Sequence, residues 1–378
     1  MNEFIIFGKP VIGNDEINEV IDSLKSGWLG TGPKAKIFET EMSKYKGIDY
    51  SIALNSATAG LHLSCLALDL KPGDEIITTA MTFCATVNTI IHAGAKPVLV
   101  DIDPITWNID VNKIEEKINK NTKAIIPVHF AGRSCKMNKI MSIAKSYNLS
   151  VIEDCAHAIE TEYYGKKAGT IGDFGVFSFY ATKNLAIGEG GMVISNDEEK
   201  MSKIKALALH GMSKDAWNRF SDDGYKHYKV QHAGFKYNMP DLMASIGIHQ
   251  LRKLEKFSIR RKEIWNLYIE EFKDLPINLP AIVESNTRHA YHLFNIGIDE
   301  KRCGISRNNF LNQMNKFNIG VGVHYDSIPT HPYYQAKFGW NPNDCPISYK
   351  FGNETVSIPL SPYLMPCLEY NHPYPYVI

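Results

Sequence analysis

The chain has 378 residues, 44% of them hydrophobic, and its 41 basic and 41 acidic side chains give a formal net charge of zero. A chain of this length and apolar content can bury a large core, and we expect one large and one smaller domain. The basic residues are scattered, which argues against a nucleic-acid partner. We expect no membrane contact and a cytoplasmic location, because no apolar stretch could span a bilayer and the first residues lack a signal peptide's long apolar core.

The cysteine and histidine residues indicate neither a disulfide framework nor a metal site. The chain has seven cysteines, an odd number, and they are well spread along the sequence. Such usage is typical of reduced, intracellular proteins. There is no Cys-x-x-Cys motif, and His129, His324 and His331 lack the spacing of metal ligands, so we expect no metal.

Short apolar runs alternate with helical segments over the first two hundred residues. The strand-like runs are residues 50–54, 75–78, 96–100, 123–128, 149–152 and 192–195. This alternation is typical of an α/β protein, in which crossover helices connect the strands of a mostly parallel sheet. We therefore expect that the ligand site lies where the carboxyl ends of these strands meet.

The pattern changes near Pro240. Asn238 and Pro240 indicate a helix start, after which apolar residues recur at helical spacing over 242–254. Strand-like runs follow at 292–298 and 355–358, as expected for an α+β unit. The sequence therefore predicts a large domain over residues 1–250 and a smaller C-terminal α+β domain over residues 251–378.

A run of small residues follows the first predicted strand. Ser56, Ala57 and Thr58 lead into a helical run over 61–68. Backbone N–H groups at a helix start, together with the hydroxyls of Ser56 and Thr58, favour the binding of a dianion such as a phosphate. By itself, however, the pattern indicates only a good helix N-cap.

Two further residues lie where predicted strands end. The ring of Phe83, just beyond the second strand, could stack on a flat heteroaromatic cofactor or belong to the core. Asp154 follows the strand 149–152, and a carboxylate at this edge of the sheet needs a cation or several donors. A protonated pyridine nitrogen is such a cation. The alternative is that Asp154 caps the following helix.

Lys183 lies in the run 177–184, among apolar, aromatic and small residues, and glycines follow it at 188, 190 and 191. Burial lowers the pKa of an amine, and a neutral amine is what a Schiff base with an aldehyde requires. Ser178, five residues earlier, can bond an anion. Taken alone, a lysine in such a run more often only packs its stem on apolar residues. Paired with Asp154, it predicts a site for pyridoxal 5′-phosphate (PLP).

Taken in order, these segments resemble the DegT/StrS group of sugar aminotransferases, which are PLP-dependent enzymes of fold type I (the aspartate aminotransferase superfamily). The resemblance covers nearly the whole chain. The motifs that carry it are Gly27-Trp28-Leu29-Gly30-Thr31-Gly32-Pro33, Asn55-Ser56-Ala57-Thr58, Glu153-Asp154-Cys155-Ala156-His157-Ala158, Phe177-Ser178-Phe179, Thr182-Lys183-Asn184, Gly188-Glu189-Gly190-Gly191, Gly234-Phe235-Lys236-Tyr237-Asn238-Met239 and Val323-His324-Tyr325.

The resemblance also implies roles for individual residues. As catalytic residues, Lys183 would hold the cofactor as a Schiff base and Asp154 would pair with its pyridine nitrogen. His157 would lie near the phenolic oxygen of the cofactor, and Phe83 would stack on its ring. The implied phosphate ligands are Ser178, Ala57 and Thr58, joined by Lys236 or Asn238 of a second subunit. The implied substrate contacts are Trp28, His324 and Tyr325.

The reaction implied by the resemblance is a transamination. An amino group would pass from L-glutamate to the cofactor, giving pyridoxamine phosphate, and then to a nucleotide-linked keto sugar. The expected acceptor is a 4-keto-6-deoxy hexose on UDP or dTDP, for amino-sugar or polysaccharide biosynthesis. The alternatives are a PLP-dependent nucleotide-sugar dehydratase, whose branch of the family has His in place of Lys183, and a non-catalytic regulatory member.

The resemblance further implies a homodimer with shared active sites. An aromatic and basic tract over residues 217–229 could contact the nucleotide diphosphate of the substrate or the second subunit. The late loop that begins at His324 departs from the motif common in the family, so the sequence does not name the sugar.

Overall fold

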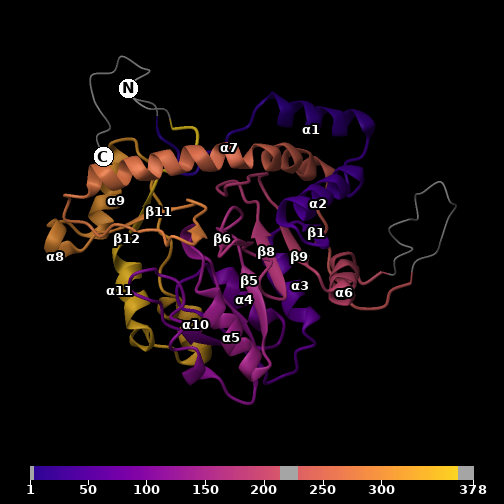
Figure 1. The fold of residues 1–378 in the computed structure, drawn as a ribbon, viewed down its shortest axis with the longest axis horizontal. Coiled ribbons are helices and arrows are strands. Elements are labelled where there is room, and N and C mark those ends of the chain that lie inside the picture. The colour runs from indigo at the N-terminus through magenta and orange to yellow at the C-terminus, as the bar shows by residue number, and fades with distance from the viewer. Residues whose placement is uncertain (1–3, 213–228, 365–378) are drawn as a thin grey trace.

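The computed structural model describes residues 4–212 and 229–364. A seven-stranded sheet in the order β1-β9-β8-β5-β4-β2-β3 forms its centre (Figure 1). The strands are β1 (Tyr50–Leu54), β2 (Glu75–Thr79), β3 (Lys96–Val100), β4 (Thr122–Ile126), β5 (Ser150–Asp154), β8 (Phe174–Ser178) and β9 (Gly191–Ser195). Neighbouring strands are parallel from β8 to β3, whereas β9 is antiparallel to both β1 and β8. The predicted α/β fold with a mostly parallel sheet is confirmed.

The predicted strands do not include β8, which carries Ser178 at its end. Its sequence contains Gly175, and glycine weakens a strand because it has no side chain to pack. The structure gives the reason for this glycine: a Cβ atom at Gly175 would lie 2.3 Å from the Cα of Gly169. Two segments of backbone therefore touch here, and the glycine that hides the strand in the sequence is required by its packing.

Apolar side chains cover both faces of the sheet. Met192 and Ile194 of β9 join one cluster with α2 (Pro33–Lys46), whereas Val193 between them joins another with α3 (Ala57–Ala67). Successive side chains of a strand point to opposite faces. The central strands are therefore buried on both sides, which explains their nearly continuous apolar sequences.

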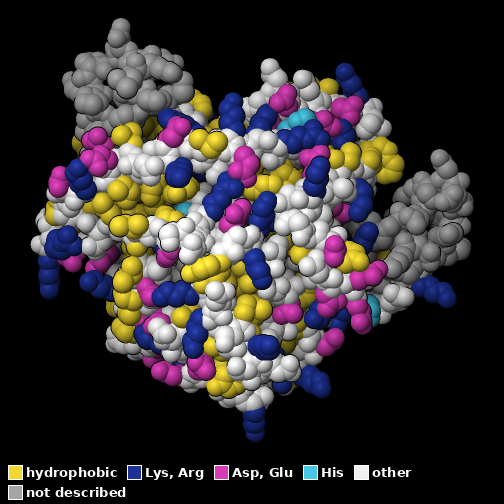
Figure 2. All heavy atoms as spheres, in the orientation of Figure 1, with side chains coloured by type: hydrophobic (Ala, Val, Ile, Leu, Met, Phe, Trp, Pro, Cys, Tyr) yellow, Lys and Arg dark blue, Asp and Glu magenta, His cyan; other side chains and the backbone are white. Residues whose placement is uncertain are grey.

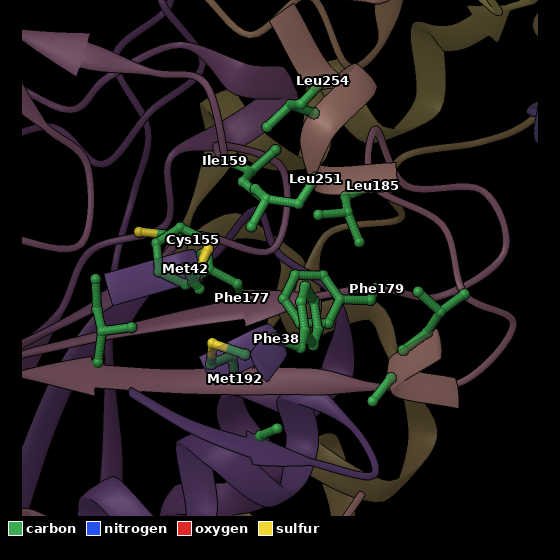
Figure 3. Close-up of a cluster of buried hydrophobic side chains, with 14 of the residues drawn as sticks. Phe38, Met42, Cys155, Ile159, Phe177, Phe179, Leu185, Met192, Leu251 and Leu254 are labelled. Atoms are coloured by element: carbon green, nitrogen blue, oxygen red, sulfur yellow. The ribbon is translucent and has the colours of Figure 1, made fainter. Parts of the chain in front are cut away.

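The first of these clusters fixes the segment around Lys183. Figure 3 shows Phe177 and Phe179 of this segment packed among side chains from several elements, with the rings of Phe38 and Phe179 5.2 Å apart. The backbone of Phe179 bonds that of Gly190 on one side and that of Ile187 on the other. The loop between β8 and β9 is thus anchored in the core on both sides of Lys183.

The long helix α7 (Asp241–Phe272) runs along the molecule above the sheet in Figure 1, and α1 (Asn14–Ser26) and α2 pack against it. Gly247 permits the close approach, because a Cβ atom there would lie 2.8 Å from the ring of Phe38. The helix continues without a break through residue 250. The division of the chain into domains after residue 250 stays a prediction.

Two small sheets and several further helices complete the structure. β11 (Phe294–Gly297) pairs antiparallel with β12 (Thr355–Ile358), and a second small sheet has the order β10-β6-β7. The elements not yet located are β6 (Glu162–Tyr163), β7 (Lys166–Lys167), β10 (Thr287–Arg288), α4 (Cys84–His92), α5 (Met137–Tyr147), α6 (Glu198–Ala208), α8 (Glu300–Cys303), α9 (Arg307–Lys316), α10 (Pro332–Phe338) and α11 (Pro346–Glu354). Aromatic side chains of α7 pack on β11 and β12 and form the core of the C-terminal part.

Basic and acidic side chains are interspersed over the face that Figure 2 shows, in keeping with the zero net charge. Within residues 4–212 and 229–364, none of the helices is both long and apolar enough to cross a membrane.

The core of the C-terminal part yields a test of the packing. Phe294 is fully buried, with its ring 4.7 Å from that of Trp265. We expect Phe294→Ala to lower the free energy of unfolding by about 3–5 kcal/mol, because it removes a buried ring and leaves a cavity. The control is Phe317→Ala, the same change at a side chain that is 67% exposed, with an expected effect below about 0.5 kcal/mol. Denaturant unfolding measures both, and equal losses would contradict this packing.

Candidate active site

A cavity of about 310 Å³ opens at the edge of the sheet where the carboxyl ends of β5 and β8 meet the start of α3. Nine of the twelve site residues predicted from the sequence line it: Ala57, Thr58, Phe83, Asp154, His157, Ser178, Lys183, His324 and Tyr325. The parallel strands bring these distant segments to one edge. The predicted residues Trp28, Lys236 and Asn238 are not part of its lining.

Lys183 reaches this cavity from the anchored loop between β8 and β9. Burial lowers the pKa of its amine to about 8, although the negative charge of Asp154 opposes the shift. A substantial fraction of the amine is therefore neutral near physiological pH, as a nucleophile toward an aldehyde must be. The apolar residues that flank Lys183 in the sequence predict this burial and the lowered pKa of the amine.

Asp154 lies at the end of β5 and is 4% exposed. Its Oδ2 accepts a hydrogen bond of 2.8 Å from the hydroxyl of Thr86, and its Oδ1 accepts one of 3.1 Å from the backbone N–H of Ala156. Burial raises the pKa of this carboxyl, while these two donors and Lys183 lower it. The alternative that Asp154 caps a following helix is wrong, because the segment after Asp154 is a turn and not a helix.

His157 and Tyr325 form a pair whose proton positions follow from their neighbours. Nδ1 of His157 accepts a hydrogen bond of 3.2 Å from the N–H of Ala131, and its Nε2 lies 2.9 Å from the Tyr325 hydroxyl. Burial holds the pKa of His157 well below its usual range, so the ring is neutral and carries its one proton on Nε2. The imidazole therefore donates to Tyr325, and the proton of the phenol is free for another acceptor in the cavity.

The start of α3, supported by the first residue of β9, forms another side of the cavity. Ser56 caps α3, and its hydroxyl accepts a hydrogen bond of 3.1 Å from the N–H of Ala59. Ala57 and Thr58 are the first two residues of the helix, where backbone N–H groups have no partner within the helix. A Cβ atom at Gly191 would lie 2.4 Å from the backbone nitrogen of Ala57. β9 thus supports the helix start from behind, and this arrangement suits a phosphate.

The remaining predicted residues lie at the mouth of the cavity or away from it. Phe83 lines the cavity and is 57% exposed, which excludes the alternative that it belongs to the core. Trp28 lies between α1 and α2, off the cavity. The side-chain amide of Asn238 bonds the hydroxyl of Thr31 within the same chain. The roles predicted for Trp28, Lys236 and Asn238 stay predictions.

Residues 217–228 of the predicted aromatic and basic tract lie outside the described residues.

Other residues of the lining have no predicted role in the sequence. Thr86 bonds the Asp154 carboxylate directly, and Thr82 bonds Thr86. Tyr180 and Glu189 also line the cavity. Thr86 lies in the first turn of α4, whereas Thr82 precedes both the helix and its N-cap residue, Phe83. Their contact depends on the turn between strand and helix, so no regular spacing in the sequence marks them.

Buried potential metal ligands occur behind Asp154, where His129, Glu153 and Cys155 approach one another. The lone pairs of His129 and Glu153 are engaged in hydrogen bonds. Glu153 accepts hydrogen bonds from His129 and from the backbone N–H groups of residues 169, 171 and 172, and Nδ1 of His129 accepts one from the N–H of Cys135. Glu153 thereby stabilises the loop before β8, and these bonds give Glu153 and His129 a structural role.

The cavity fits PLP in the chemistry of its donors. A buried carboxylate that lacks a bonded cation matches a pyridinium nitrogen. An amine of lowered pKa matches an aldehyde, and the start of α3 with the Ser178 hydroxyl matches a phosphate dianion. These groups line a single cavity. Fold and site together therefore define a PLP-dependent enzyme of fold type I.

The chain belongs to the DegT/DnrJ/EryC1/StrS aminotransferase family, whose family model matches residues 10–366. It is 46% identical over 362 residues to the spore coat polysaccharide biosynthesis protein SpsC of Bacillus subtilis strain 168, an alignment that covers 96% of this chain and 93% of SpsC. The predicted family membership is confirmed.

Solved structures of the family agree. The putative sugar aminotransferase Spr1654 from Streptococcus pneumoniae, in its pyridoxamine-phosphate (PMP) form, has a TM-score of 0.88 and 34% identity, over 96% of this chain and 94% of that one. Its PLP form has the same TM-score. Helicobacter pylori PseC, an aminotransferase of pseudoaminic acid biosynthesis, also has a TM-score of 0.88, at 29% identity, over 96% of this chain and 95% of that one. The predicted cofactor, PLP, is confirmed.

The lowered pKa of Lys183 predicts how the apoprotein captures its cofactor. Only the neutral amine attacks an aldehyde, so the rate of PLP capture should rise with pH to half its maximum near pH 8 instead of near 10.5. Borohydride trapping followed by mass spectrometry of the Lys183 peptide measures this rate. Asp154→Asn should move the midpoint lower, because the carboxylate favours the charged amine. A midpoint at or above pH 10 would contradict the burial of Lys183.

The pair of His157 and Tyr325 predicts energetic coupling. Tyr325→Phe removes the acceptor of the buried His157 N–H and should lower the free energy of unfolding by about 1–3 kcal/mol. In a double-mutant cycle with His157→Asn, the two losses should fail to add by about 0.5 kcal/mol or more. Tyr180→Phe is the control, since Tyr180 lines the same cavity and is 47% exposed. Additive losses for the pair would show that the contact is not a hydrogen bond.

Proposed function

We propose that this protein transfers an amino group from L-glutamate to a nucleotide-linked keto sugar, a 4-keto-6-deoxy hexose on UDP or dTDP, in amino-sugar or polysaccharide biosynthesis. The observation that carries the proposal is that the Lys183 amine and the Asp154 carboxylate line one cavity with the start of α3. Membership of a sugar aminotransferase family supports the reaction class. The names of SpsC and PseC support a product used in a polysaccharide or an amino sugar.

Lys183 has two tasks in this proposal. PLP, when bound, supplies an electron sink that stabilises negative charge on the carbon next to the transferred nitrogen. Lys183 first holds the cofactor through its amine and, once displaced by the amino donor, moves the proton at that carbon. A base works best when its pKa lies near the working pH, and burial brings the pKa of this amine to about 8.

Asp154 keeps the proton on the pyridine nitrogen in this proposal, since a buried carboxylate without a bonded cation strongly favours an N–H donor. Phe83, which lines the same cavity, would stack on the cofactor ring. His157 stays neutral and directs the free hydroxyl of Tyr325 into the cavity, where it can donate to the cofactor or to the sugar. Nδ1 of His324 lies 2.8 Å from the Ser357 hydroxyl, so the predicted contact of His324 with substrate would involve Nε2.

We further propose a homodimer in which Lys236 or Asn238 completes the phosphate site of the partner. Supporting this, large hydrophobic side chains are exposed in the cavity lining, Phe83 by 57% and Tyr180 by 47%, and between α1 and α2, Trp28 by 47% and Leu29 by 48%. Among the described residues, the buried Oδ1 of Asn238 has no hydrogen-bond partner. A second subunit would cover these exposed hydrophobic side chains and could supply a hydrogen-bond donor to Oδ1 of Asn238.

The test follows the cofactor spectrum as ¹⁵N-labelled L-glutamate and then UDP-, dTDP- and GDP-linked 4-keto sugars are added. The proposal expects glutamate to convert PLP to pyridoxamine phosphate, and one keto sugar to reverse this and gain ¹⁵N by mass spectrometry. A sugar that loses oxygen without gaining nitrogen would identify a dehydratase, although Lys183 opposes that alternative. A spectrum that neither addition changes would identify a non-catalytic binding member.

Two substitutions separate the roles of the paired groups. Lys183→Ala should lose the absorbance of the covalently held cofactor and slow the glutamate half-reaction by at least about 10²–10⁴-fold, because holding group and base are both removed. Asp154→Asn should retain that absorbance yet slow the half-reaction by orders of magnitude, because an amide does not hold the pyridine proton. Stopped-flow absorbance measures both rates. A near-normal rate in either variant would refute the role of that residue.

A further inference from the structure

Three buried side chains in the lining of the cavity form a chain of hydrogen bonds. The Thr82 hydroxyl lies 2.8 Å from that of Thr86, which in turn lies 2.8 Å from Oδ2 of Asp154. The three residues are 2%, 1% and 4% exposed. Thr82 follows β2 and Thr86 lies in the first turn of α4, whereas Asp154 ends β5 on the far side of β4. The chain therefore bridges three strands at the edge of the sheet.

The direction of these hydrogen bonds follows from the charge on Asp154. An ionised carboxylate only accepts, so the Thr86 hydroxyl gives its single proton to Asp154. The oxygen of Thr86 must then accept from Thr82. Both hydroxyl dipoles point their positive ends at the carboxylate, and hydrogen bonds that line up in this way strengthen one another in a medium of low dielectric. The chain favours the ionised form, because hydrogen bonds to a charged group are the stronger ones.

The other groups near Asp154 do not replace this chain. The backbone N–H of Ala156 contacts the other oxygen, Oδ1. The titratable groups that act on Asp154 are Lys183 and His129, which favour its ionised form, and Tyr325, Cys135 and Cys155, whose own ionisation it disfavours. Of the described side chains, only Thr86 donates a hydrogen bond to the carboxylate.

We propose that Thr86, supported by Thr82, is a positioning residue that keeps the Asp154 carboxylate ionised and turned toward the pyridine nitrogen of the cofactor. The inference rests on the proposed pairing of Asp154 with that nitrogen. Without the Thr86 hydroxyl, the carboxylate becomes more basic and competes for the shared proton. The N–H···O⁻ pair then shifts toward N···H–O, with no other bond made or broken, and a neutral pyridine is the poorer electron sink.

The first experiment measures Asp154 itself, in the full-length protein without cofactor. Aspartate labelled with ¹³C at the side-chain carboxyl gives a titration curve by NMR, and Asp154→Asn assigns the signal. Thr86→Val, which removes the hydroxyl but keeps the shape, should raise the titration midpoint by about one pH unit or more. Thr86→Ser should restore it to within a few tenths of a unit, and Thr82→Val should raise it by a smaller amount.

Thr89→Val is the matched control. Thr89 lies one turn further along α4 and is fully buried, and its hydroxyl bonds the backbone oxygen of Thr86 and not Asp154. The substitution removes an equally buried hydroxyl from the same helix and should leave the midpoint unchanged. An unchanged midpoint in Thr86→Val, or an equal shift in Thr89→Val, would overturn the inference. If Thr86→Val does not fold, Thr82→Val provides the same test. An unchanged titration midpoint of Asp154 in Thr82→Val would then overturn the inference.

The second experiment adds the cofactor and L-glutamate and follows the half-reaction rate against pH. Thr86→Val should slow the reaction about 10-fold or more and move the acidic limb of the profile to higher pH, and Thr86→Ser should restore both. A merely structural role would change the amount of folded protein but not the pH at which the acidic limb of the rate profile falls. If the carboxyl titration shifts while the half-reaction profile does not, Thr86 acts on Asp154 but not on the cofactor, and both the positioning role and the proposed pairing fall.

Discussion

Two buried groups of opposite charge, the amine of Lys183 and the carboxylate of Asp154, face the same cavity. Burial drives each toward its neutral form, and their mutual attraction opposes both shifts. Such a pair repays the cost of desolvation only when its geometry is fixed and its remaining hydrogen bonds are made. Much of the surrounding structure can be understood as the means of fixing that geometry.

The position of Asp154 is fixed by the central sheet. Parallel pairing sets the end of β5 beside the ends of β4 and β8, and Thr86 and Ala156 hold the two carboxylate oxygens. The position of Lys183 is fixed through the next residue, Asn184. The side chain of Asn184 bonds Glu160, the backbone oxygen of Ala290 and His292. These partners come from segments far apart in the sequence, so the position of the amine depends on the fold as a whole.

The sequence predicts the parts of the site whose residue types carry their own signal. Asp154 after an apolar strand, and Lys183 among aromatic and small residues, are uncommon enough to be noticed, and their order indicates the family. The sequence does not predict β8, because Gly175 interrupts its apolar pattern. Glycine is required there because the backbone of Gly169 leaves no room for a side chain. Thr86 was missed because an ordinary helical threonine becomes significant only when the sheet brings it to Asp154.

The cavity also separates chemistry from recognition. The groups proposed to act on the cofactor lie on the edge of a sheet that is packed on both faces, where a change in one side chain disturbs many others. At the mouth, Phe83 and Tyr180 are about half exposed, and of the described C-terminal residues only His324 and Tyr325 belong to the lining. If the proposed sugar binds at this mouth, substitutions there should alter which sugar fits while the surroundings of Asp154 and Lys183 stay unchanged.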